Sequence, residues 1–170
     1  AALLAQRPDL ARHGLLLVTG TRVAVDPSHA AALEAAVLAQ VQARKLDLQL
    51  TLVPGDDGLV ELAGAGPDWR PGNSVPILTE AFVTGVAGIS VGTQALLGEG
   101  WNAPAANVLV DLTSVASSQA VQQLRGRTMR LDPARPDKVA HNWDVVCIDP
   151  RSEDGDPDLR RFVRRHEQLW

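Results

Sequence analysis

The chain has 170 residues, of which 45% are hydrophobic and 21% are charged, and its formal net charge is −4. This balance is typical of a folded globular protein and argues against intrinsic disorder. It also argues against a free-standing nucleic-acid-binding domain, which usually has a strong basic excess, although backbone N–H groups could still contact a few phosphates. Because no apolar run is long enough to span a bilayer and no signal peptide is evident, we expect a cytoplasmic protein without membrane association.

The N-terminal quarter of the chain predicts two helices with two strands between them. An alanine- and leucine-rich segment, 1–12, predicts the first helix, and because the chain opens inside it we expect a piece of a longer polypeptide. Apolar runs at 14–18 and 22–25 predict strands. The Asp-Pro pair that follows is a typical helix start. With apolar residues at helical spacing after it, a second helix is predicted over about 27–45.

The middle of the chain predicts a strand, a loop and a helix. Alternating apolar and polar residues over 48–53 predict a half-buried strand. The Gly- and Pro-rich stretch up to Asn73 predicts a short hairpin and a surface loop, and we interpret Trp69 in this loop as a plug over the core. Ser74 predicts the start of a helix that continues to about Thr84.

The C-terminal half predicts three strands and two helices. Its strands are expected at 88–91, 107–112 and 142–148, and its helices at 114–130 and from Asp156 onwards. The single cysteine, Cys147, has no partner for an internal disulfide, and its apolar neighbours predict a thiol in a buried strand. The last helix has a basic face formed by Arg160, Arg161, Arg164 and Arg165, which we interpret as a solvated helix surface.

Strands and helices alternate almost throughout, which predicts an α/β fold. We expect a single three-layer domain over residues 1–170, with a mostly parallel central sheet and helices on both faces. In such a fold the carboxyl ends of the strands share one edge. The loop after Val91 and the segment 114–130 are therefore expected to lie close together.

The pattern Q-x-x-G-R-x-x-R, formed by Gln123, Gly126, Arg127 and Arg130, organises this last segment. Residues three and four apart share a helix face, so the two arginines would present fixed positive charges together. The planar guanidinium suits phosphate oxygens and can stabilise the charge on a transferring phosphoryl group. A solvated helix end, with arginines favoured by the helix dipole, is the alternative interpretation.

A second motif lies upstream, in the loop Gly92-Thr-Gln-Ala-Leu-Leu-Gly-Glu-Gly-Trp-Asn-Ala-Pro104. An apolar strand and the Thr/Ser-rich segment 113–118 separate it from the arginine pattern. This order resembles motifs V and VI of the second RecA-like domain of superfamily 2 helicases and translocases. The resemblance covers about residues 88–130, and it implies a RecA-like fold and an ATP-dependent enzyme that acts on nucleic acid.

The resemblance implies roles for both motifs. Arg127 and Arg130 would be arginine fingers that reach the γ-phosphate of ATP held by a partner domain, with Gln123 helping to organise that cleft. Gly126 would lie on the nucleotide side as well. In the upstream loop, Gly100 and Asn102 would lie near the nucleotide and Glu99 would support the loop. These residue assignments are expectations that come from the family alone.

The resemblance also implies a track for nucleic-acid phosphates. Gly92 and Thr93 would face the phosphates, and Thr113 and Ser114 are further candidates. Backbone amides and hydroxyls grip a nucleic-acid backbone without reading its sequence. We expect DNA as the partner, with RNA possible. Asn102 departs from the usual Asp of the motif, which puts a metal- or water-linked role at this position in doubt.

The sequence lacks the parts that hold ATP in this family. No G-x-x-x-x-G-K-[ST] loop and no D-E-x-H or D-E-x-D box occurs, and the only lysines, Lys45 and Lys138, do not follow a glycine loop. ATP and Mg²⁺ would therefore be bound mainly by an N-terminal RecA-like domain of the same polypeptide. We expect no metal ligands in this chain and no activity from it alone.

Two other interpretations stay open. A RecA-like domain that has lost its part in hydrolysis would serve as a docking module, which the Asn102 departure favours. An unrelated nucleotide-binding α/β domain would need a G-x-G-x-x-G turn after a strand. The chain begins such a turn at Gly98, but residues 101–103 do not complete it.

Overall fold

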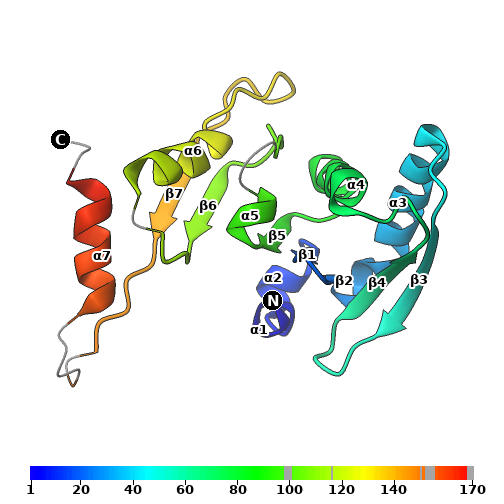
Figure 1. Ribbon diagram of the computed structural model, residues 1–170, viewed down its shortest axis with the longest axis horizontal. Coiled ribbons are helices and arrows are strands. Elements are labelled where there is room, and N and C mark those ends of the chain that lie inside the picture. Colours follow the sequence, from blue (N-terminus) through cyan, green and yellow to red (C-terminus); the bar gives the residue numbers. More distant parts are fainter. Residues whose placement is uncertain (98–100, 116, 150, 152–155, 168–170) are drawn as a thin grey trace. The chain divides into compact units, whose positions relative to one another are not determined.

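The chain folds into two compact units, Ala1–Ala103 and Pro104–Trp170, and each unit has a sheet of its own (Figure 1). The computed structural model describes residues 1–97, 101–115, 117–149, 151 and 156–167. Within these ranges, no helix has both the length and the apolar character needed to cross a membrane.

The first unit is built on a five-stranded sheet in the order β3-β4-β2-β1-β5. Its strands are β1 (Leu15–Val18), β2 (Val23–Val25), β3 (Gln49–Pro54), β4 (Val60–Ala65) and β5 (Ile89–Gly92). The pairs β1–β2, β2–β4 and β3–β4 are antiparallel, and β1–β5 is parallel, with Leu15 opposite Ile89. The sheet is therefore mixed and mostly antiparallel.

The expected mostly parallel, three-layer RecA-like sheet is wrong, and two tight turns explain why. The first joins β1 to β2, where the Thr19 N–H donates to the Arg22 carbonyl at 2.8 Å. The second joins β3 to β4, where the Gly55 N–H donates to the Leu59 carbonyl at 2.8 Å and Gly58 has a φ of +79°. Turns this short can connect only antiparallel neighbours, because a parallel pair needs a crossover.

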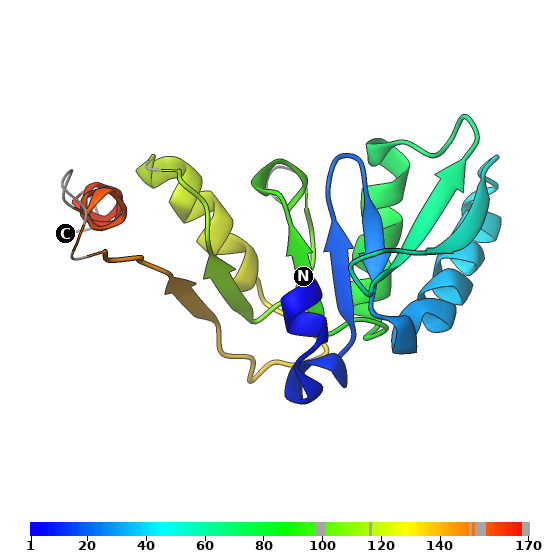
Figure 2. The same cartoon turned by 90° about the horizontal axis from the view of Figure 1, so that it is seen from below.

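Helices cover both faces of this sheet (Figure 2). They are α1 (Ala2–Ala5), α2 (Pro8–Ala11), η1 (Pro27–His29), α3 (Ala30–Arg44), α4 (Pro71–Val83) and α5 (Gln94–Leu97). Helices α3 and α4 pack on one face and bury the main core, which includes Leu33, Val37, Val41, Ile77, Leu78 and Ala81. On the other face, Ala5 of the short α1 and Ala1, which precedes this helix, pack against Leu15, Ala24 and Leu59.

The predicted helix start at Asp26 is confirmed. Its buried carboxylate accepts hydrogen bonds from the N–H groups of Leu15 at 2.8 Å and Ser28 at 3.1 Å, and lies 2.9 Å from His29 Nδ1. Burial raises the pKa of Asp26, but the hydrogen bonds from Ser28, His29 and Leu15 outweigh it and hold this pKa below its ordinary value. Asp26 therefore joins the start of β1 to the turn that leads into α3.

The interpretation of Trp69 as a plug is also confirmed. Its indole packs against the main core and covers Gly64 of β4, where a Cβ atom would lie only 2.1 Å from Trp69 Cδ2. Glycine is required at this position because any side chain would displace the ring.

The second unit is a strand–helix–strand arrangement with an added C-terminal helix. Its elements are β6 (Val108–Asp111), α6 (Ser118–Thr128), β7 (His141–Asp144) and α7 (Pro157–His166). β6 and β7 are parallel, and their register places Asp111 opposite Asp144. α6 packs against both strands, so the predicted strand–helix–strand order is present here.

Two details of this unit differ from the expectation. α6 begins at Ser118 rather than at Ser114, and β7 ends at Asp144 rather than at 148. Cys147 follows the strand and is exposed, so the prediction of a core thiol is wrong. The backbone N–H of Cys147 instead donates to Asp158 Oδ2 of α7 at 3.2 Å.

Candidate functional site

Three of the four residues of the arginine pattern lie on the outward face of α6. Val121 and Thr128 are buried against the rest of the unit, whereas Gln123 and Gly126 are exposed and Arg127 is partly exposed. Arg130 follows two residues after the helix ends at Thr128 and is also partly exposed. The helix therefore presents the pattern on its outward face and at its C-terminal end.

Gly126 has open space around it. A Cβ atom added there would meet nothing within 4 Å among the described residues. Within a helix, glycine costs about 0.5–1 kcal/mol relative to alanine, and packing inside this unit gives no reason for that cost. A helix surface without a side chain lets another backbone or a ligand approach closely.

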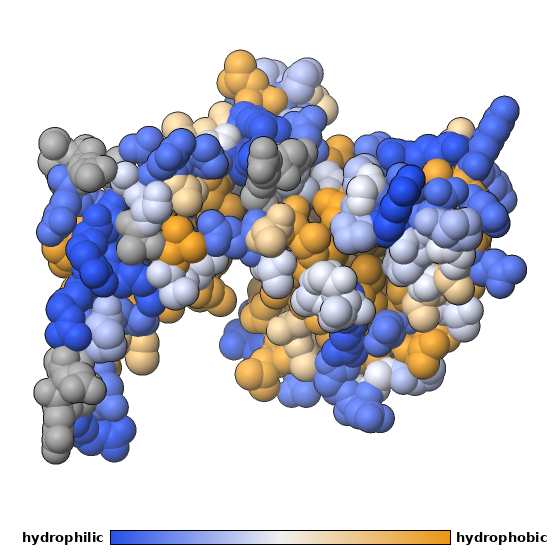
Figure 3. Space-filling model, viewed as in Figure 1, coloured by the Kyte–Doolittle hydropathy of each residue, from blue (hydrophilic) through white to orange (hydrophobic). Residues whose placement is uncertain are grey.

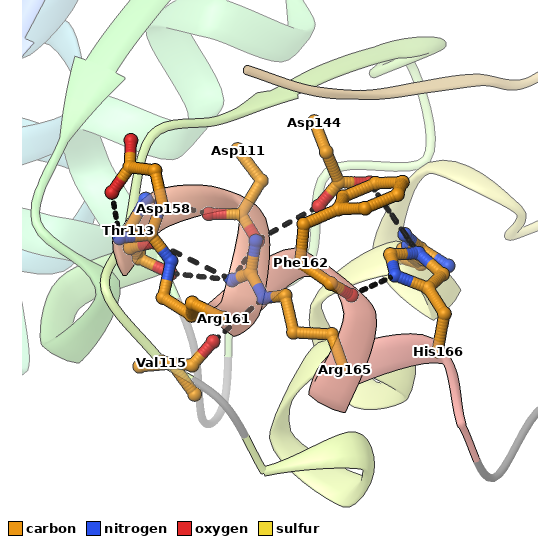
Figure 4. A network of polar contacts seen from close by, with 10 residues as sticks. Asp111, Thr113, Val115, Asp144, Asp158, Arg161, Phe162, Arg165 and His166 are labelled. Carbon is orange, nitrogen blue, oxygen red and sulfur yellow. Dashed lines mark hydrogen bonds and ion pairs between the residues drawn. The ribbon is translucent and has the colours of Figure 1, made fainter. Parts of the chain in front are cut away.

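A buried charge network holds the unit together behind this helix (Figure 4). Arg165 of α7 is only 1% exposed. Its Nη2 donates to Asp111 Oδ2 and its Nη1 donates to Asp144 Oδ1, each at 2.8 Å. Its Nε donates to the Val115 carbonyl at 2.6 Å and its Nη2 also donates to Thr113 Oγ1 at 3.1 Å. One guanidinium thus joins the carboxyl ends of both strands to the segment that leads into α6.

The same network extends into α6. Arg125, on the inward side of the helix, forms an ion pair with Asp144. Its Nη2 lies 2.7 Å from His166 Nε2, while His166 Nδ1 lies 2.7 Å from the Phe162 carbonyl oxygen. These contacts fit a His166 tautomer with the proton on Nδ1. Two guanidinium groups therefore balance two carboxylates between α6, α7 and the strand ends.

This network was not predicted from the sequence. Asp111 and Asp144 each end a strand, and a carboxylate at the same end of two neighbouring parallel strands is a signal of a shared partner. Arg165 was interpreted as part of a solvated basic face, which is wrong for this residue because it is buried. Arg160 and Arg164 fit the interpretation, because both are exposed, and the surface over this helix is mostly hydrophilic in Figure 3. Arg161 does not, since its side chain is mostly covered and pairs with Asp158 at 2.7 Å.

The predicted nucleic-acid contacts divide between the two units. Gly92 ends β5 and Thr93 follows it, and both are exposed in the first unit. Thr113 and Ser114 lie in the second unit, where Ser114 is exposed. Thr113 has a structural role there, since its N–H donates to Asp111 Oδ1 at 2.8 Å and its hydroxyl accepts from Arg165.

The predicted nucleotide contacts are divided in the same way. Asn102 is exposed in the first unit, and the arginine pattern lies in the second. Glu99 and Gly100 lie outside the described residues. The expectation that the two motifs meet therefore stays a prediction.

The first unit contains a cavity of about 350 Å³ between the β1–β2 turn and the start of α4. Its lining includes Thr19, Thr21, Ser74, Arg22 and Trp69. Arg22 is already paired, with Asp57 at 2.8 Å and Glu61 at 3.3 Å. The Arg22 guanidinium lowers the pKa of Asp57 to about 2. None of the predicted site residues that the structure describes lines this cavity.

The guanidinium groups of Arg127 and Arg130 are chemically suited to the oxygens of a phosphate group. Among the described residues, no cluster of three or more His, Cys, Asp or Glu side chains could hold a metal ion. A scan against protein-family models, a search of curated proteins and a search of solved structures each found no match.

Proposed function

We propose that this chain is part of the motor of an ATP-dependent nucleic-acid helicase or translocase. In this proposal, Arg127 and Arg130 act on ATP that is held by another domain of the same polypeptide. The observation that carries it is the Q-x-x-G-R-x-x-R pattern, which lies on the outward face and at the C-terminal end of α6, directly after β6 of a parallel pair. A cytoplasmic location is part of the same proposal.

The proposed chemistry is hydrolysis of the bond between the β- and γ-phosphates: water attacks the γ-phosphorus, ADP leaves, and inorganic phosphate is released. Mg²⁺, if it is bound with ATP by the other domain, would neutralise charge on the phosphate oxygens. The guanidinium groups of Arg127 and Arg130 donate N–H bonds to those oxygens and stabilise the negative charge of the transition state. Gln123, on the same face of α6, helps to order the cleft, and bare backbone at Gly126 permits close approach.

Nucleic acid is the proposed second ligand, with DNA first and RNA as an alternative. Gly92 and Thr93 are exposed at the end of β5, where a backbone N–H and a hydroxyl can contact phosphates without reading bases. Such contacts need no basic excess, which suits a chain whose net charge is −4. Hydrolysis should therefore be stimulated by nucleic acid of any sequence.

Hydrolysis of ATP by the polypeptide that contains both domains tests the proposal. Turnover is measured with and without single-stranded and duplex DNA, for wild type, Arg127→Ala and Arg130→Ala. We expect stimulated turnover in wild type and a loss of about 10³–10⁵-fold in each variant, the range that an arginine finger contributes. The isolated 170 residues should not exceed a buffer blank, because they lack the ATP-cradling loop.

The matched control is Arg164→Ala, which removes an exposed arginine of α7. Its turnover should equal that of wild type, which separates an effect of these positions from a general effect of lost positive charge. ATP turnover that is unchanged in both Arg127→Ala and Arg130→Ala would overturn the proposal.

A non-catalytic docking module is the second candidate. Two departures from the helicase family favour it: Asn102 replaces the usual Asp, and the sheet of the first unit is mostly antiparallel. A docking module predicts that both arginine variants keep the wild-type level of turnover, so the same experiment distinguishes the two candidates.

A further inference from the structure

Lys138 binds three backbone carbonyl oxygens from two separate parts of the second unit. Its Nζ donates to Thr128 O at 2.9 Å, to Pro104 O at 2.7 Å and to Ala106 O at 3.0 Å. An ammonium group has three protons, so these carbonyls use all of its donors. Burial lowers the pKa of Lys138, and nearby Asp132 opposes that shift.

The Thr128 carbonyl belongs to the last residue of α6. The final carbonyls of a helix lack intrahelical partners and carry the negative end of its dipole, so a cation there is favourable. Thr128 is held a second time, since its hydroxyl donates to Asn142 Oδ1 of β7 at 2.8 Å. The helix end that carries the arginine pattern is therefore fixed in place.

The chain on the far side of Arg130 is fixed as well. Asp132 accepts from the Ala134 N–H at 3.1 Å and from Arg135 Nε at 3.0 Å. Arg135 also donates to the Ala105 carbonyl, and its own carbonyl accepts from the Lys138 N–H at 3.0 Å. Arg130 thus lies midway between Thr128 and Asp132, two anchored residues on a turn that Lys138 closes.

We propose that Lys138 is a positioning residue that sets the place of Arg130 by clamping the end of α6 to the segment Pro104–Ala106. This inference rests on the proposed function, in which Arg130 binds a phosphate of ATP. The clamped segment begins at Pro104, which is the last residue of the upstream motif. Within the second unit, Lys138 therefore fixes the position of Arg130 relative to the segment Pro104–Ala106.

A double-mutant cycle on the polypeptide that contains both domains tests the inference. ATP turnover stimulated by DNA is measured for wild type, Lys138→Met, Arg130→Ala and the double variant, with kcat and KM determined separately. A displacement of about 1 Å can cost ~10²-fold in rate, so we expect Lys138→Met to lower kcat by about 10–100-fold. In the Arg130→Ala background, Lys138→Met should have almost no further effect on kcat. Both substitutions disrupt the same contact, the one between Arg130 and the phosphate.

Lys45→Met is the control, since Lys45 is the chain's other lysine and is exposed in the first unit. Its kcat should match wild type. Thermal unfolding shows whether Lys138→Met folds. If it does not, Lys138→Gln takes its place in the cycle. The glutamine amide can still donate N–H hydrogen bonds to the carbonyls, but it has no positive charge.

The outcomes separate the two proposals. Turnover that survives Arg130→Ala contradicts the proposed function itself. Turnover that collapses in Arg130→Ala, with a Lys138 variant that leaves kcat unchanged or lowers it by the same factor in both backgrounds, contradicts the positioning role alone.

Discussion

Arg165 shows how one residue can join three segments of the second unit. Its guanidinium donates to Asp111, Asp144, Thr113 and Val115 while only 1% of the residue is exposed. A buried ion pair adds little stability beyond a well-packed apolar replacement, but removing one partner leaves an uncompensated charge. Removing Arg165 should therefore cost more stability than the net contribution of a typical ion pair would suggest.

Replacing Arg165 with Ala should destabilise the protein by about 3–5 kcal/mol, because the Asp111 and Asp144 carboxylates lose their main partner inside the unit. Urea unfolding followed by circular dichroism measures this change. Arg164→Ala, one residue earlier and exposed, should change stability by less than about 0.5 kcal/mol. Equal effects of the two substitutions would mean that the buried network does not support the unit.

At the scale of elements, the two faces of α6 differ. The inner face is bonded to β7, and the outer face has no neighbour at Gly126 among the described residues. Arg125 and Thr128 bind Asp144 and Asn142 of β7, whereas Gly126 meets no neighbour among the described residues. If α6 had only a structural role, alanine at position 126 would make the helix more stable than glycine does.

Gly126→Ala should therefore separate stability from activity. Alanine should stabilise the second unit by about 0.5–1 kcal/mol through helix propensity alone. In the proposed motor, the added methyl group should lower stimulated ATP turnover, because it obstructs the close approach at the cleft. Thermal unfolding and turnover of the same preparation provide both readouts. A variant that is more stable and fully active would show that nothing approaches this face.

The two hairpins of the first unit are joined by the Arg22–Asp57 pair at 2.8 Å. The Arg22 hydrogen bond lowers the pKa of Asp57 from 3.8 to about 2. Because the folded pKa is below the unfolded one, the stabilisation is fully present above pH 3.8 and is lost as the pH falls towards about 2.

Asp57→Asn should consequently lower stability at pH 7 and weaken its dependence on pH between about 4 and 2. Thermal unfolding of wild type and variant at half-unit steps of pH measures this. Asp56→Asn is the control, because Asp56 is exposed in the same turn and no ion pair is found for it among the described residues. Parallel stability curves for wild type and Asp57→Asn would contradict the account.

At the scale of the whole molecule, local patterns were predicted from the sequence and long-range pairing was not. The Asp26 cap, the helix after it and the β6–α6–β7 order follow from residue spacing and turn chemistry. The strand direction in the first unit does not, since two hairpins replaced the expected crossovers. The turns at Thr19 and Gly55 are too short for a parallel crossover, so their lengths in the sequence already indicate antiparallel pairs.

The candidate site was predicted in part. The positions of Gln123, Gly126 and Arg127 on one helix face follow from helical spacing. The Arg165 network and the Lys138 clamp were not predicted, because most of their contacts join residues that are more than 20 positions apart. Such contacts depend on tertiary packing, which a single sequence does not reveal by periodicity.

The most direct test of the central claim compares ATP binding with ATP turnover in the Arg127→Ala/Arg130→Ala double variant of the polypeptide that contains both domains. Arginine fingers act in the transition state, so removing them lowers kcat while ATP affinity changes little. The account predicts a loss of at least about 10³-fold in kcat, with a Kd for ATP close to that of wild type. An unchanged kcat would contradict the account and assign the arginine pattern to docking.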